Sequence, residues 1–186
     1  PQPRESIARV RALGCPCILG NHDEFLLDGN LIHTYTQEPV LLKSVEWCRQ
    51  QVTADDLAYI KTFPATLKVD LDARNTLLCF HGSPRSNSEV IVASTPNAEV
   101  KEMLDGHLAT IMAGGHTHIQ MLRQYKDGFF LLNPGSVGEP LDETPAPGAS
   151  PNLLICAEYA ILTWQNGGMS IDLRRIPFDR ELIKQQ

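Results

Sequence analysis

The 186-residue chain has the composition of an ordinary folded domain, and its charge argues against two kinds of partner. Its length is enough for one domain with a full core and too short to demand two, and its shares of 42% apolar and 20% charged residues are those of an ordinary globular protein. The net charge of −6 argues against a broad surface for nucleic acid or anionic membrane, because either needs a basic face. No apolar run approaches the roughly 20 residues of a membrane-spanning helix.

The five cysteines favour a reducing compartment over a disulfide framework. Their number is odd, and three or four of them lie in apolar, strand-like segments, where cysteine serves as a small buried hydrophobe. The Cys15-Pro16-Cys17 triplet lacks the spacing of C-x-x-C redox and zinc sites, so we expect it to be structural. We therefore expect a cytoplasmic protein. The cysteines are Cys15, Cys17, Cys48, Cys79 and Cys156.

The N-terminal third of the chain predicts helices and one strand. Ile7 and Val10 recur at helical spacing before Gly14, which is a typical helix end. The apolar run Cys15–Leu19 then predicts a strand. Thr53, followed by an aspartate three residues later, is typical of a capping box at a helix start. We expect helices over about Arg4–Leu13, Pro39–Gln51 and Asp55–Thr62.

The rest of the chain predicts strands joined by hairpins, with one crossover helix. Thr95-Pro96 combines a preferred N-cap with a proline at the first helical position, which predicts a helix to about Asp105. Crossover helices mixed with hairpins predict the α/β class with mixed, partly antiparallel sheets. The expected strands are Leu67–Leu71, Thr76–Phe80, Leu108–Ala113, Ile119–Tyr125, Phe129–Leu132, Leu153–Trp164 and Met169–Ile176.

Three apolar runs each end in a loop that bears metal-ligating residue types. Open α/β sheets bind their ligands just beyond the carboxyl ends of such strands. Four of the six histidines lie at these ends, so we expect their side chains to converge on one site. The three loops are Gly20-Asn21-His22-Asp23, His81-Gly82 and Gly114-Gly115-His116-Thr117-His118.

The mixture of ligand types indicates which metals fit. Asparagine, histidine and carboxylate suit manganese, iron, nickel or zinc, whereas calcium and magnesium prefer all-oxygen cages and structural zinc prefers thiolates. Each loop alone has a simpler interpretation. His81-Gly82 can be a turn with a satisfied histidine, and Asn21-His22-Asp23 can be only the first turn of a helix. The occurrence of all three loops in this order is a far more specific indication of a metal site than any one of them.

The order of these motifs resembles that of the calcineurin-like metallophosphoesterases, in particular their small prokaryotic phosphodiesterase-type branch. The Asn133-Pro134-Gly135-Ser136 segment completes the matching pattern, which runs from about Pro3 to Pro177. The resemblance implies one domain over residues 1–186. Its fold would be α/β, with two mixed β-sheets packed as a sandwich and flanked by helices.

The resemblance also implies a site with two divalent metal ions, with manganese expected and iron, nickel and zinc as alternatives. Asn21, His81 and His116 would ligate one ion, and His118 the other. A metal-activated hydroxide would attack phosphorus in line with the leaving group. His22 and Asp23 would be the catalytic pair: His22 the general acid or a donor to the phosphoryl oxygen, Asp23 orienting it and raising its pKa.

The sequence departs from the family pattern at its start. The family's first two motifs, an Asp-x-His and a Gly-Asp, normally lie upstream of the opening helix and are not in this sequence. They would supply two further ligands for the ion at His118 and an aspartate that bridges both ions. We therefore expect the natural protein to carry an additional N-terminal strand–helix–strand unit. These 186 residues alone would then catalyse feebly or not at all.

The function expected from these residues is a metal-dependent phosphoesterase acting on a small phosphorylated substrate, either a phosphodiester or a phosphomonoester. One alternative is a catalytically impaired binding scaffold on the same fold, like the retromer subunit, but a scaffold has no need of His22. Another is a phosphoprotein phosphatase, which usually has glutamate where this chain has Asp23. Exposed hairpins near Gln120–Phe130 and at the C-terminus offer edges through which a homo-oligomer could form.

Overall fold

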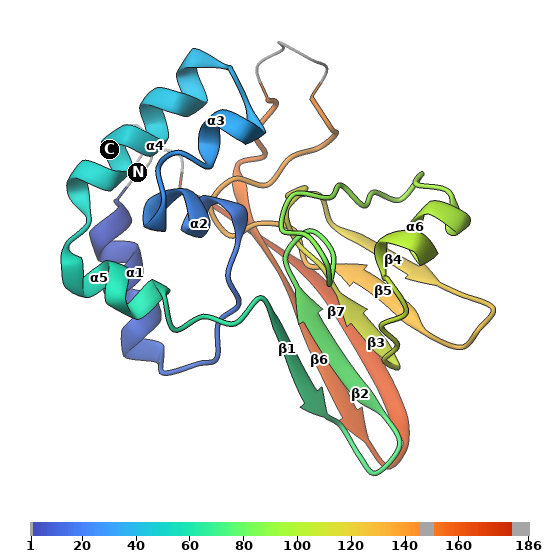
Figure 1. Ribbon diagram of the computed structural model, residues 1–186. Helices are drawn as coiled ribbons and strands as arrows, with labels where there is room; N and C mark the ends of the chain where they lie inside the picture. Colours follow the sequence, from blue (N-terminus) through green and yellow to red (C-terminus); the bar gives the residue numbers. More distant parts are fainter. Residues whose placement is uncertain (1, 146–150, 180–186) are drawn as a thin grey trace. The chain divides into compact units, whose positions relative to one another are not determined.

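A computed structural model describes residues 2–145 and 151–179 of the chain (Figure 1). The chain divides into two compact units, Pro1–Leu67 and Lys68–Gln186, and each is considered on its own. The first unit is helical, and the second holds the β-sheets. None of the described helices combines the length and apolar character that crossing a membrane would require.

The helical unit confirms the three predicted helices and adds two short ones. Gly14, with a φ of 63°, ends the first helix as predicted. Thr53 and Asp56 form the predicted capping box, in which each side chain bonds the backbone N–H of the other. The Thr53 hydroxyl also donates to the Asp56 carboxylate at 2.7 Å, and this bond, together with the one from the Thr53 N–H, holds the pKa of the Asp56 carboxyl below its usual value. The helices are α1 (Pro3–Leu13), α2 (Asn21–Leu27), α3 (Ile32–Tyr35), α4 (Pro39–Gln51) and α5 (Ala54–Ile60).

The predicted strand over Cys15–Leu19 is wrong. No regular structure is assigned to these residues, although the Leu19 N–H donates to the carbonyl of Pro64 at 2.9 Å. A strand needs a neighbour to pair with along its length, and this segment pairs with no strand among the described residues. The apolar composition of this segment was therefore not sufficient for a strand, because the segment has no neighbouring strand to pair with among the described residues.

A small apolar cluster holds the helical unit together. Phe25, Ile32 and Val45 are buried against one another, and they come from α2, α3 and α4. The Arg49 guanidinium donates to the carbonyls of Phe25 and Leu26 at the end of α2. Cationic donors at this position satisfy carbonyls that the helix leaves without partners. Long-range contacts thus fix α2, the helix on which three of the predicted site residues lie.

The second unit contains a five-stranded mixed sheet, which confirms the α/β class. The strand order is β1-β2-β3-β5-β4, in which β2, β3 and β5 run parallel and β4 runs antiparallel to β5. A second sheet consists of two strands, so it is an antiparallel ribbon where a mixed sheet was expected. The strands are β1 (Thr66–Asp70), β2 (Thr76–Phe80), β3 (Ile111–Ala113), β4 (Met121–Gln124), β5 (Phe130–Asn133), β6 (Cys156–Gln165) and β7 (Gly168–Pro177).

The crossover between β2 and β3 carries α6 (Asn97–Met103), which is shorter than the helix predicted from Thr95. Pro96 is the N-cap residue, and the predicted cap by the Thr95 hydroxyl is wrong. That hydroxyl instead accepts a hydrogen bond from the N–H of Val92, at 2.9 Å. The hydroxyl of a threonine before a helix can bond either the helix N-terminus or the preceding loop, and here it bonds the loop.

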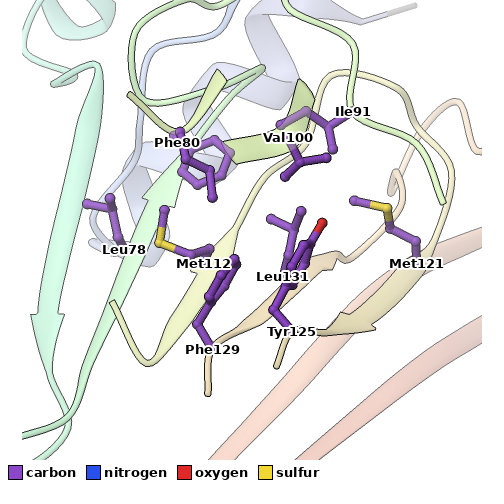
Figure 2. Close-up of a cluster of buried hydrophobic side chains, with 10 residues drawn as sticks. Leu78, Phe80, Ile91, Val100, Met112, Met121, Tyr125, Phe129 and Leu131 are labelled. Carbon is purple, nitrogen blue, oxygen red and sulfur yellow. The ribbon is translucent and has the colours of Figure 1, made fainter. Parts of the chain in front are cut away.

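The main core lies on one face of the five-stranded sheet, beneath α6 (Figure 2). Leu78, Met112 and Leu131 stand in register on adjacent strands, so they form one apolar row across the sheet. Val100 of α6 covers this row and is completely buried. Because side chains alternate faces along a strand, the position of this row also determines which strand residues face the other side of the sheet.

All five cysteines are free thiols, which agrees with the absence of a disulfide framework in the prediction. Their burial is less complete than expected. Cys156 is buried, whereas Cys15 is exposed, and the other three are half-buried. The difference at Cys15 follows from the failed strand prediction, because the residue has no pleated neighbour to cover it.

Replacing Leu131 by alanine should lower the free energy of unfolding by about 2–5 kcal/mol, because Leu131 is fully buried at the centre of the core. The matched control is Leu122→Ala on edge strand β4, where the leucine is 45% exposed and the expected loss is below about 1 kcal/mol. Urea denaturation followed by tryptophan fluorescence measures both. Equal losses would contradict this placement of the core.

Candidate functional site

The three parallel strands bring the C-terminal site residues to one edge of the sheet. Because β2, β3 and β5 run in the same direction, their carboxyl ends lie side by side. His81 follows β2, the Gly114–His118 loop follows β3, and Asn133 ends β5. Two of the three predicted strand-to-loop junctions are therefore confirmed, and the third, after Cys15–Leu19, is not.

His81 and His116 form a close pair of rings at this edge. Their ring centroids are 5.2 Å apart, and the planes are inclined by 65°. The backbone fixes the approach, because the N–H of Gly115 donates to the carbonyl of His81 at 2.7 Å. Close packing requires glycine at Gly114, where a Cβ would lie 2.9 Å from the ring of Phe80. The structure thus joins two of the predicted ligands from loops more than thirty residues apart.

His116 sits in a strained turn. Its φ is +64°, and the N–H of Thr117 donates to the carbonyl of Gly115 at 2.7 Å across it. A hydrogen bond from residue i+2 to residue i with a positive φ in the middle is the rare form of the γ-turn. Such backbone conformations cost about 1–3 kcal/mol in residues other than glycine and cluster at functional sites. The loop therefore directs the His116 ring at an energetic cost.

His118 has a ring whose tautomer is set by the backbone. Its Nδ1 lies 2.8 Å from the carbonyl oxygen of Glu139, and a carbonyl can only accept, so Nδ1 carries the proton. In the neutral ring the lone pair is then on Nε2. Histidine ligands of metals commonly bond the backbone in this way through their second nitrogen. His118 also has a positive φ, of 59°.

Asn133 was named from the sequence only as part of the Asn-Pro-Gly-Ser segment, without a role of its own, and the structure places it beside the His116 loop. It is 1% exposed, and its amide nitrogen donates to the carbonyl of Gly115 at 2.7 Å and to Oγ1 of Thr117 at 2.9 Å. Its amide oxygen accepts from the N–H of Gly135 at 2.9 Å. The signal was present in the Asn-Pro-Gly-Ser segment at the end of a strand, but turn chemistry alone accounts for that composition.

The other predicted site residues, Asn21, His22 and Asp23, form the first turn of α2 in the helical unit. Asn21 is 3% exposed, and His22 is exposed with its ring 5.4 Å from that of Phe25. The helical-turn interpretation of this segment is thus confirmed for the backbone. The roles of its side chains as ligand, acid and orienting group stay predictions.

Asp23 closes the N-terminus of α2. Its carboxylate accepts a hydrogen bond from the N–H of Gly20, at 2.8 Å. Burial raises the pKa of the Asp23 carboxyl, while this hydrogen bond and the neighbouring His22 oppose the rise. Asp23 and His22 also line a cavity of about 90 Å³ together with Ser44 and Cys48. The carboxylate therefore has a capping function besides any influence on His22.

The donors at the sheet edge fit a divalent metal, although they do not complete a site. Imidazole nitrogens bind such ions at about 2.1 Å, and two neighbouring imidazoles suit manganese, iron, nickel or zinc. In residues 2–145 and 151–179, no group of three His, Cys, Asp or Glu side chains is placed to hold one ion. His81 and His116 are therefore two neighbouring candidate ligands and not a complete metal site among the described residues.

The sequence matches the family model of the calcineurin-like phosphoesterase superfamily domain over residues 3–151. The chain belongs to this superfamily, which confirms the resemblance seen in its motifs. A curated relative, the uncharacterized protein MJ0912 of Methanocaldococcus jannaschii, is 21% identical over 154 residues, which cover 75% of this chain and 60% of the relative. This chain thus spans less than two thirds of that relative's length.

Two solved structures share the fold. A metallophosphoesterase from Sphaerobacter thermophilus is 22% identical with a TM-score of 0.68, over 95% of this chain and 72% of that one. The hypothetical protein PH1004 from Pyrococcus horikoshii OT3 is 16% identical with a TM-score of 0.76, over 100% of this chain and 73% of that one. At these identities the likeness concerns the fold, which is that of a metallophosphoesterase.

The strain at His116 predicts that glycine is more stable than alanine at this position, which is the reverse of the order in a helix. Glycine adopts a positive φ without penalty, so the His116→Gly protein should be more stable than the His116→Ala protein by about 1 kcal/mol. His33 is the control, because it is exposed in helix α3, where alanine should be more stable than glycine by about 0.5–1 kcal/mol. Thermal unfolding of the four variants measures both differences. The same order at both positions would contradict a strained turn at His116.

Proposed function

We propose that the protein is a metal-dependent phosphoesterase that hydrolyses a phosphodiester or a small phosphomonoester. Its superfamily supports phosphate-ester hydrolysis. The observation that carries the proposal is the His81–His116 ring pair, with 5.2 Å between centroids, at the carboxyl edge of the parallel strands. Strained backbone at His116 adds support, because such conformations in residues other than glycine cluster at functional sites.

The proposed ligands divide between two divalent ions, with manganese expected and iron, nickel or zinc as alternatives. His81 and His116, together with Asn21, would hold one ion, and Nε2 of His118 would bind the other. When bound, such ions neutralise phosphate charge and lower the pKa of water. The Glu139 carbonyl supports the role of His118, because it keeps the proton on Nδ1.

His22 is the proposed general acid. Its exposure on the first turn of α2 allows it to reach a substrate and to exchange protons with solvent. A histidine that protonates the leaving alkoxide typically contributes about 10²–10⁴-fold to the rate. Asp23, the next residue, would orient the ring and attract its protonated form.

The proposed setting is the cytoplasm, supported by five free thiols that suit a reducing compartment. The proposed ligand is a small phosphorylated molecule, since the net charge of −6 disfavours an extended nucleic-acid or anionic-membrane surface. The β4–β5 hairpin, in which β4 is an edge strand, is a proposed surface for a homo-oligomer.

Hydrolysis of bis-p-nitrophenyl phosphate by the whole protein tests the function. We expect EDTA to abolish turnover, manganese to restore it, and His81→Ala or His116→Ala to lower it by about 10²-fold or more, since each removes a ligand. His22→Ala should lower turnover with little change in metal affinity. His107→Ala is the matched control, because this exposed histidine lies outside the site.

A rate equal to the wild type in both His81→Ala and His116→Ala would contradict the proposal. Absence of turnover with manganese, iron, nickel and zinc, on both this diester and p-nitrophenyl phosphate, would favour the non-catalytic scaffold.

A further inference from the structure

The strained turn at His116 needs groups that hold it, and the structure indicates which residue does so. We propose that Asn133 is a positioning residue, which keeps His116 in its left-handed turn and thereby keeps its ring beside that of His81. The inference rests on the proposed function only for the role of the two rings as metal ligands. The positioning of the His116 ring by Asn133 depends on hydrogen bonds within this chain and needs no bound metal.

Asn133 bonds the residues on both sides of His116. Its amide nitrogen reaches the Gly115 carbonyl, one residue before the histidine, and the Thr117 hydroxyl, one residue after it. The Gly115 carbonyl is the same atom that accepts the bond across the γ-turn. Asn133 therefore fastens both ends of the turn, and it does so from a side chain that is 1% exposed.

The position demands an amide. Two hydrogens on nitrogen supply the two donated bonds, and the amide oxygen accepts the bond from Gly135. Aspartate has nearly the same shape but only accepts when ionised. In an Asn133→Asp protein, a carboxylate oxygen would thus face the Gly115 carbonyl oxygen, and the two would repel.

The loop behind Asn133 sets which way the amide points. Gly135 has a φ of +82°, and a Cβ on it would lie 2.1 Å from Oε2 of Glu158, so the loop packs tightly on β6. The Glu158 side chain is fully buried and pairs with Arg175 of β7 through a 2.6 Å contact. With the Gly135 N–H fixed toward the amide oxygen, the amide nitrogen must face Gly115. The ribbon thereby supports the site through Asn133.

Nuclear magnetic resonance of the metal-free protein tests the inference directly. In the wild type we expect a proton NOE between the rings of His81 and His116, whose centroids are 5.2 Å apart. The NOE should disappear, or weaken at least fivefold, in Asn133→Asp. Asn75→Asp is the matched control: Asn75 lies in the same unit, and its amide oxygen accepts from Thr110. That variant can lose stability but should keep the NOE.

Manganese affinity of the same proteins gives a second readout. Loss of a group that orients a ligand typically weakens metal binding by about 10–100-fold, which we expect for Asn133→Asp but not for Asn75→Asp. If Asn133 acts through His116, adding Asn133→Asp to His116→Ala should weaken binding by less than about twofold further. Thr117→Val, which removes one of the two bonds, should give an intermediate loss, and Thr117→Ser should restore the wild-type value.

The inference is overturned if the folded Asn133→Asp protein keeps the ring NOE at wild-type intensity. It is equally overturned if the effects of Asn133→Asp and His116→Ala on affinity multiply independently. Failure of the proposed function has a different signature. The wild type would then bind no manganese and hydrolyse no ester, while the comparison of NOEs would still decide the role of Asn133.

Discussion

A single residue, Gly115, connects the ends of the parallel strands through its backbone N–H and its backbone carbonyl, and the candidate site depends on it. Its N–H donates to the carbonyl of His81 after β2, and the Gly115 carbonyl accepts from Asn133 at the end of β5. Three strands that are distant in sequence are thereby tied at one edge, where their carboxyl ends already meet. The sheet brings the loops together, and these hydrogen bonds fix the orientation of the rings within them.

Strained backbone conformations at this edge of the sheet occur together with specific hydrogen bonds from neighbouring residues. Four non-glycine residues in the described chain have a positive φ: Asp105, His116, His118 and Asn166. Asp105 and Asn166 precede glycines in turns, where aspartate and asparagine tolerate that conformation. The two histidines, by contrast, do not precede glycines, and hydrogen bonds from Asn133 and to Glu139 accompany their turns. Strain held by surrounding structure is a common feature of sites that must present side chains in one direction.

Sequence reasoning succeeded where local chemistry and periodicity act together. The helix Pro39–Gln51 and the final hairpin were predicted closely, because apolar spacing and turn residues agree there. Placing His81 and His116 at one edge followed from the rule for parallel strands. These successes share a cause, since each depends on short-range signals or on a general property of sheets.

The failures depended on partners that a linear pattern does not reveal. Cys15–Leu19 has strand-like composition but pairs with no strand in the described residues, and the Thr95 hydroxyl bonds Val92 in place of the helix end. Asn133 looked only like part of a turn. Its bonds to Gly115 and Thr117 span more than fifteen residues, so the local sequence pattern does not reveal them. Such contacts become visible only when the sheet places the loops together.

The most direct test of the account is whether His81 and His116 bind one ion together. Electron spin echo envelope modulation of the protein loaded with manganese detects imidazole nitrogens bound to the ion. We expect nitrogen modulation in the wild type that diminishes in His81→Ala and in His116→Ala, with no change in His107→Ala. A spectrum like that of hydrated manganese, or one that neither substitution alters, would contradict it.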